Sequence, residues 1–332
     1  MKRRRFLGTA AAAAAALTPF GRAALAFASR KKFSAKADFR GRSIRVRSKK
    51  VFKDDGALDE KTCRILIREA LAELSGSKDT TSVFRTLFDP EDWVGIKVNT
   101  IAGRRLSTRP ELVRAVISFL DEVGVKRERI VVFDRYSHEL RRAGFHVGND
   151  EGYYCVGTDG LEGGGYSGNL FESGRVGTRI SRIVTERCTA LIDMPVVKDH
   201  ELAGVSGSLK NWYGVISNPN KYHANGCDPF IADLNELDLL RRKVRLAIAD
   251  GTLSQCEGGP GYKRRWAWRW GGIVAGTDLV AVDEGIRRVL EEERARKGLP
   301  TLEEAKRPAR FIGTCARRGL GVVPEKVDLK EV

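Results

Sequence analysis

Short apolar runs alternate with segments of helical periodicity along most of the chain. Five runs bounded by polar or glycine positions are expected to form strands: 93–99, 130–134, 190–193, 246–250 and 272–276. Three segments with apolar residues at helical spacing are expected to form helices: 110–123, 231–242 and 281–296. This alternation predicts an α/β fold with a mostly parallel sheet flanked by helices.

The chain is expected to divide into three parts, of which the first is a signal peptide at residues 1–28. Residues 29–90 are an N-terminal extension with one helix, from about Asp59 to Leu74, which Gly76 ends. Within the extension, residues 42–47 partly alternate as an edge strand lying on the surface would. Residues 91–332 form the α/β domain, and its aperiodic glycine-rich stretch near 157–170 is either a junction between two lobes or a surface loop.

The helix expected at 110–123 begins at Pro110, and Thr108 is its expected cap.

Residues 1–28 are predicted to be a twin-arginine signal peptide. Arg4 and Arg5 stand directly before a Phe-Leu pair, and Ala26 and Ala28 suit cleavage before Ser29. An uncleaved anchor is the alternative, but a span needs roughly 20 strongly apolar residues and the alanine run is shorter. The protein is therefore expected in the periplasm or another extracytoplasmic compartment, in contact with the membrane only through the export machinery.

The composition of the chain restricts the kinds of ligand and partner that are expected. The formal net charge of +16 becomes +11 when the five basic residues of 1–28 are removed, which favours a small anionic ligand. Export excludes nucleic acid as the expected partner. The six cysteines form no C-x-x-C pair, so zinc ribbons and ferredoxin clusters lose support, and the thiols are expected to be small buried hydrophobes.

Polar residues end four of the expected strands: Asn99, Asp134, Asp193 and Asp250. Ligands of open α/β sheets bind beyond the carboxyl ends of the strands, so these side chains are candidates to line one crevice. The alternative is that they cap helices or open turns. Lys97 is a further candidate, because a lysine inside an apolar strand must be paired or reach an edge.

The stretch 195–214 and the residues after it hold the densest set of reactive side chains: Lys198, His200, Lys210, Asn211, His223 and Cys227. Imidazole and thiolate groups are ligands for transition metals, and lysines hold anions. His200 and His223 are also the candidate proton carriers near neutral pH. The alternative is that each histidine only forms hydrogen bonds within a loop.

Two later segments are candidates of a weaker kind. Gly258 and Gly259 could bring backbone amides close to an anion, or they form a plain turn. The run 263–270 interleaves cations with tryptophans, as in a flap, a partner surface or ordinary cation–π packing.

Several of these segments together resemble the family called domain of unknown function 362. The resemblance covers about residues 90–290 and rests on the following matches: 95–99, 110–113, Asp134, 195–200, 206–211 with Gly214, His223, Asp233, 250–251, 258–260, Asp278 and Asp283. Many relatives carry a segment of clustered cysteines, which this sequence lacks. The order of elements is also distantly similar to nickel-pincer lactate racemases, which would make His138 and His200 acid/base residues, Lys198 or Lys210 a cofactor holder and His223 a metal ligand.

The expected function is an exported protein with a metal- or cofactor-dependent site, carrying out redox or isomerase chemistry on a small anionic metabolite. The catalytic candidates are His200 and His223. The candidate cofactor-binding residues are Lys97, Asn99, Asp134, Lys198, Lys210, Asn211, Gly258 and Gly259, and the candidate metal ligands are His200, His223 and Cys227. The cofactor itself is not identified by the sequence, and a transition metal is one candidate. The alternative is a non-catalytic extracytoplasmic binding or accessory protein that helps to mature a redox partner.

Overall fold

The computed structural model describes residues 39–332, which belong to one compact unit. The predicted signal peptide, residues 1–28, lies outside the described residues. The stretch 157–170, where the sequence leaves open a lobe junction, lies inside this unit.

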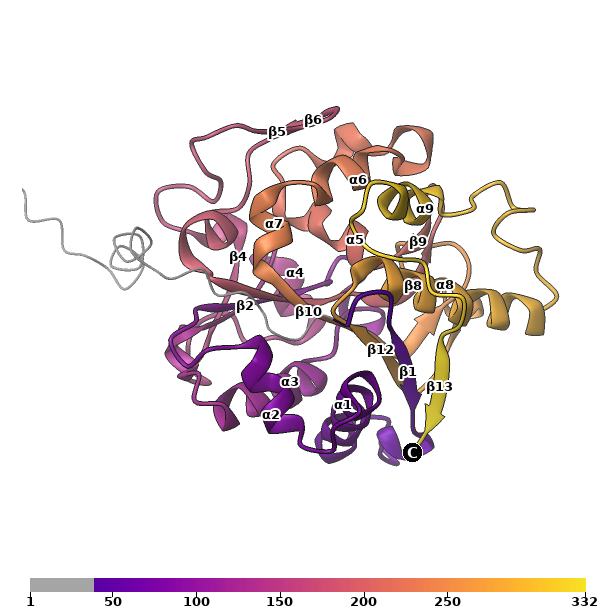
Figure 1. Cartoon of the computed structure of the whole chain (residues 1–332), viewed down its shortest axis with the longest axis horizontal. Helices are drawn as coiled ribbons and strands as arrows, with labels where there is room; N and C mark the ends of the chain where they lie inside the picture. The colour runs from indigo at the N-terminus through magenta and orange to yellow at the C-terminus, as the bar shows by residue number, and fades with distance from the viewer. Residues whose placement is uncertain (1–38) are drawn as a thin grey trace, which may run out of the picture. The chain divides into compact units, whose positions relative to one another are not determined.

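An eleven-stranded sheet forms the centre of the described part, with the path β13-β1-β12-β10-β7-β2-β3-β4 (Figure 1). Its strands are β1 Ile44–Arg47, β2 Val94–Val98, β3 Ile130–Asp134, β4 Tyr154–Gly157, β7 Ala190–Met194, β8 Val196–His200, β9 Gly204–Ser206, β10 Val244–Gln255, β11 Ala267–Trp268, β12 Gly272–Gly276 and β13 Asp328–Glu331. A separate hairpin pairs β5 Phe171–Ser173 with β6 Val176–Thr178. The pairs from β10 through β7, β2 and β3 to β4 are all parallel, whereas β12 is antiparallel to both β10 and β1. The prediction of a mostly parallel α/β sheet is confirmed.

Helices cover both faces of this sheet (Figure 1). They are α1 Glu60–Ser75, α2 Thr80–Leu87, α3 Pro110–Glu122, α4 Ser137–Ala143, α5 Ser208–Asn211, α6 Phe230–Asn235, α7 Asp238–Lys243, α8 Leu279–Arg296 and α9 Arg310–Arg317. Alternate strand residues point to opposite faces. Accordingly Ile96, Val132 and Ile192 pack in one core with α1, α2 and α3, while Phe133 and Leu191 pack in a second core with α5 to α9.

Residues that start and stop helices in the sequence predicted the position of α1. Helix α1 begins after Asp59, whose carboxylate accepts from the Thr62 amide at 2.8 Å, and it ends at Gly76, which has a left-handed φ of 72°. The helix expected at 231–242 is instead two short helices, α6 and α7.

Two expectations were wrong, one about the cap of α3 and one about the position of β1 at the edge of the sheet. Thr108 does not cap α3; the cap position is Arg109, and the Thr108 hydroxyl donates to the Met194 carbonyl at 2.6 Å. Strand β1 is not an edge strand, because β13 pairs with its outer side, and Ile44 and Val46 are buried rather than lying on the surface.

The six cysteines are free and buried, as expected for small hydrophobes. Among residues 39–332, no helix is long and apolar enough to cross a membrane.

Candidate functional site

Polar side chains gather at the carboxyl ends of β2, β3 and β7. Lys97 lies opposite Asp193 in the register of β2 with β7, and its ammonium group forms an ion pair with Asp134 Oδ1 at 2.8 Å. The Lys97 side chain is only 1% exposed. Buried charges require such partners, so the Lys97 charge is already neutralised within the protein.

Asn211, at the end of α5, links the strands. Its Oδ1 accepts from Lys97 Nζ at 3.3 Å and from Asn99 Nδ2 at 3.1 Å, and its Nδ2 donates to Asp193 Oδ1 at 2.7 Å. The other oxygen of Asp193 has no hydrogen-bond partner. Burial raises the pKa of Asp193 to about 7, so this carboxyl group can hold a proton near neutral pH. Three of the four predicted strand-end residues, Asn99, Asp134 and Asp193, therefore do come together.

Lys198 approaches the same group from β8. Its Nζ donates to Asn99 Oδ1 at 2.9 Å, and the residue is completely buried. None of the carboxylates in the described part of the chain forms an ion pair with it. Burial lowers the pKa of Lys198 to about 7; Asp134 opposes this shift, and Lys210 reinforces it.

Lys210 and His223 form a second pair beside Lys198. The His223 Nδ1 lies 3.0 Å from the Pro219 carbonyl, which can only accept, so this nitrogen carries the proton. His223 Nε2 is then free to accept from Lys210 Nζ at 3.1 Å. Lys210 also lies 4.5 Å from the centre of the Tyr213 ring, and burial lowers its pKa to about 8.

The structure brings His200 and His223 together, with ring centres 5.7 Å apart and planes inclined by 26°. His200 Nδ1 accepts from the amides of Leu202 and Ala203, both at 3.2 Å. Burial lowers the pKa of His200 to about 2, so this ring stays neutral, and burial also lowers the pKa of His223. Asp193, Lys198 and Lys210 therefore have pKa values near neutrality, whereas His200 does not.

The predicted metal set is not assembled in this structure. Across residues 39–332, no three side chains of His, Cys, Asp or Glu are placed to hold a metal ion together. His223 uses both ring nitrogens within the protein, and the buried thiol of Cys227 has a pKa raised by burial. This donor set does not fit a resident transition metal.

Asp250 does not join the cluster. Strand β10 continues past it to Gln255, and the Asp250 side chain accepts from the Arg109 amide at 2.8 Å, at the start of α3. The predicted crevice therefore lacks this residue, and the alternative role at a helix start applies to it.

Gly258 and Gly259, which follow β10, form a turn that is hydrogen-bonded within the protein. The Gly259 amide donates to Asp199 Oδ1 at 2.9 Å, so it is already used within the protein. A Cβ at this glycine would lie 2.1 Å from the Asp199 carbonyl oxygen. Gly258 has a left-handed φ of 73°. Asp199 in turn pairs with Arg307 at 2.7 Å, a contact across 108 residues that no local signal in the sequence could indicate.

The remaining candidates lie on the surface or in packing. His138, in α4, and His146 are both exposed. Arg265 covers the Trp266 ring at 4.5 Å and Trp268 belongs to β11, which matches ordinary cation–π packing beside the sheet.

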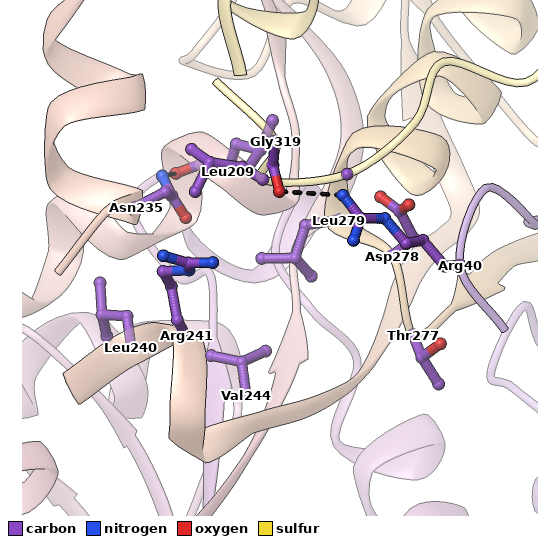
Figure 2. Close-up of a pocket in the computed structure, with 12 residues that line it drawn as sticks. Arg40, Leu209, Asn235, Leu240, Arg241, Val244, Thr277, Asp278, Leu279 and Gly319 are labelled. Carbon is purple, nitrogen blue, oxygen red and sulfur yellow. Dashed lines mark hydrogen bonds between the residues drawn. The ribbon is translucent and has the colours of Figure 1, made fainter. Parts of the chain in front are cut away.

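A cavity of about 210 Å³ is lined by Leu209 of α5, the residue between Ser208 and Lys210 (Figure 2). Figure 2 shows Arg40 reaching across to the Gly319 carbonyl, with Asp278 beside it. None of the predicted site residues lines this cavity.

Fold and site together define the class: an α/β protein whose mostly parallel sheet carries a buried lysine-rich cluster at the carboxyl ends of its strands. Residues 94–286 match the family model described as domain of unknown function, DUF362. The match spans more than half of the chain, so the chain belongs to this family. A search of curated proteins found no match.

A search of solved structures matched, among others, two chains of low sequence identity. A crystal structure of a protein from Thermotoga maritima has 14% identity and a TM-score of 0.43, covering 73% of this chain and 60% of that one. The lactate racemase apoprotein from Thermoanaerobacterium thermosaccharolyticum has 14% identity and a TM-score of 0.41, covering 74% of this chain and 59% of that one. This chain thus spans less than two thirds of either structure.

Proposed function

We propose that the protein binds a small anionic ligand, a carboxylate or a phosphate, through Lys198 and Lys210. One observation carries this proposal: two lysines are buried side by side in a polar cluster, and neither has a carboxylate partner among residues 39–332. Lys97 differs from these two lysines, because it forms an ion pair with Asp134. Burying an uncompensated charge is costly, and a bound anion would remove that cost.

The chemistry that fits this cluster is isomerase or redox chemistry on the bound anion, with protons moved by the lysines. A group that exchanges protons efficiently has a pKa near the working pH. Lys198 and Lys210 meet this condition, whereas His200 does not. The anionic group could belong to the metabolite itself or to a cofactor, and the same lysines would hold it in either case.

The test is a titration of the exported protein, residues 29–332, with inorganic phosphate and acetate by calorimetry. Lys198→Met and Lys210→Met should each weaken binding at least tenfold, because each removes one ammonium contact. Lys243→Met is the matched control, since Lys243 is also buried and also has a lowered pKa but lies outside the cluster. Circular dichroism verifies that each variant is folded.

Unchanged affinity in both cluster variants would refute the proposal. Bound metals should be measured on the same samples by mass spectrometry. A stoichiometric transition metal that disappears in the His200→Ala, His223→Ala double variant would replace the lysine-centred site with a histidine-centred one.

A further inference from the structure

Two loops stand beside the polar cluster where Asn99 and Lys198 meet. The first comprises residues 99–108 and is fixed at both ends. The Thr100 hydroxyl donates to Asp134 Oδ2 at 2.7 Å, and the Thr108 amide donates to the Asn99 carbonyl at 3.0 Å. The loop therefore leaves the cluster and returns to it.

The second loop follows β10 and is held next to Lys198. Gln255 is buried and lies opposite Lys198 in the register of β10 with β8. Its side-chain amide donates to the Gly261 carbonyl at 2.8 Å and accepts from the Lys263 amide at 2.5 Å. Tyr262 and Lys263 are thereby placed beside the strand that carries Lys198.

The two loops touch each other. The guanidinium group of Arg105 in the first loop lies 5.5 Å from the centre of the Tyr262 ring in the second. A cation–π contact orients a guanidinium group without neutralising its charge. Arg105 therefore keeps its charge at the junction of the two loops.

The only acid in these two loops is Glu257, which follows β10 and is already paired with Arg294 and Arg307. Residues 99–108 and 258–265 contain no Asp or Glu. Their exposed basic residues, here called the basic rim, are Arg104, Arg105, Lys263, Arg264 and Arg265. None of these five forms an ion pair with the described residues, whereas exposed arginines elsewhere, such as Arg127 with Asp121, do.

We infer that the basic rim makes the protein select ligands with two anionic groups, a dicarboxylate or a phosphorylated carboxylate, in which Arg105 binds the second group. The inference rests on the proposed function, which assigns the first group to Lys198 and Lys210. A rim of one sign beside a buried cationic site attracts such a ligand and binds its far end. Arg105 acts in this scheme as a specificity-determining residue.

The experiment compares ligands that differ by one charge. Butyrate and succinate share a four-carbon chain, and 3-phosphonopropionate replaces one carboxylate of succinate with a phosphonate. We expect the tighter of the two doubly charged ligands to bind the exported protein about tenfold more tightly than butyrate. Their order of affinity distinguishes a dicarboxylate from a phosphorylated ligand.

Arg105→Gln should remove this preference and leave butyrate affinity unchanged. Arg242→Gln is the matched control, because it removes the same charge from an exposed arginine on α7 that pairs with Asp238. Arg242→Gln should change the affinity for none of the three ligands. Equal affinity for butyrate and both doubly charged ligands, or an equal loss for all of them in Arg105→Gln, would overturn the inference while leaving the proposed function intact. If acetate or phosphate binds the wild-type protein but none of these three ligands does, the inference alone is overturned. If acetate and phosphate also fail to bind, the proposed function is overturned with it.

Discussion

Replacing Lys198 with methionine should change how the stability of the protein depends on pH. Burial lowers the pKa of Lys198 from 10.5 to about 7 in the folded state. Between these two values the unfolded chain holds one proton more than the folded chain at this position. The free energy of unfolding of the wild type therefore rises with pH across this window, and the full penalty of the buried charge is present below it.

The size of the effect follows from the gap between the two pKa values. At about 1.4 kcal/mol per unit, the penalty below pH 7 is about 5 kcal/mol. Methionine removes this penalty but also loses the hydrogen bond to Asn99, which contributes about 1 kcal/mol. Lys198→Met should consequently be more stable than the wild type at about pH 6, by up to roughly 4 kcal/mol, and slightly less stable near pH 10.

Urea unfolding followed by tryptophan fluorescence at several pH values measures this difference. Lys243→Met provides the comparison, because burial lowers the pKa of Lys243 only to about 8 and its window is correspondingly narrower. The buffers must contain no phosphate, since a bound anion would stabilise the charged lysine. A difference between Lys198→Met and the wild type that stays constant from pH 6 to pH 10 would refute the reasoning.

Three further changes test other parts of the structure. Asn211→Leu should destabilise the protein by about 2 to 4 kcal/mol, because the residues it joins lose buried hydrogen bonds, and a loss below 1 kcal/mol in urea unfolding would contradict the linking role. Arg307→Met should cost about 3 to 5 kcal/mol by leaving the Asp199 carboxylate buried without its cation, which thermal unfolding at pH 7 would report; an unchanged midpoint would count against it. Arg4→Lys with Arg5→Lys should retain the protein in the cytoplasm as an unprocessed precursor, and normal appearance outside the cytoplasm in cell fractionation would rule out the twin-arginine route.

Local periodicity predicted much of the fold, because the signals for strands and helices are contained in neighbouring residues. Strand β3, for example, has the predicted bounds 130–134, and α1 lies within one residue of its predicted bounds and ends at the predicted Gly76. The addition of β13 outside β1 could not be predicted in this way, since it joins segments from the two ends of the described chain.

The site was predictable only where topology alone decides it. Parallel strands place their carboxyl ends at one edge, so the meeting of Asn99, Asp134 and Asp193 follows from the fold class. For Asp250 the alternative applies: Leu246 and Ile248 of the same strand pack in the core that contains α3, and the Asp250 carboxylate accepts from the amide at the start of that helix. The face that a strand residue occupies depends on register, which changes with a shift of one residue.

The pairing of Lys210 with His223 depends on the short turns between residues 219 and 227, which have no periodicity in the sequence. The protonation states of the cluster could not be predicted from the sequence either. Histidines are the usual groups that titrate near neutral pH, but in this structure burial lowers the pKa of His200 to about 2 and that of Lys198 to about 7.

The six buried thiols have a consequence for how the protein reacts with oxidants. Burial raises the pKa of every one of them, so each stays protonated and poorly reactive at neutral pH. No disulfide joins the described residues, and none of these thiols is exposed to an oxidant. Each thiol therefore serves the core as a small apolar group, and it meets an oxidant only when the fold opens around it.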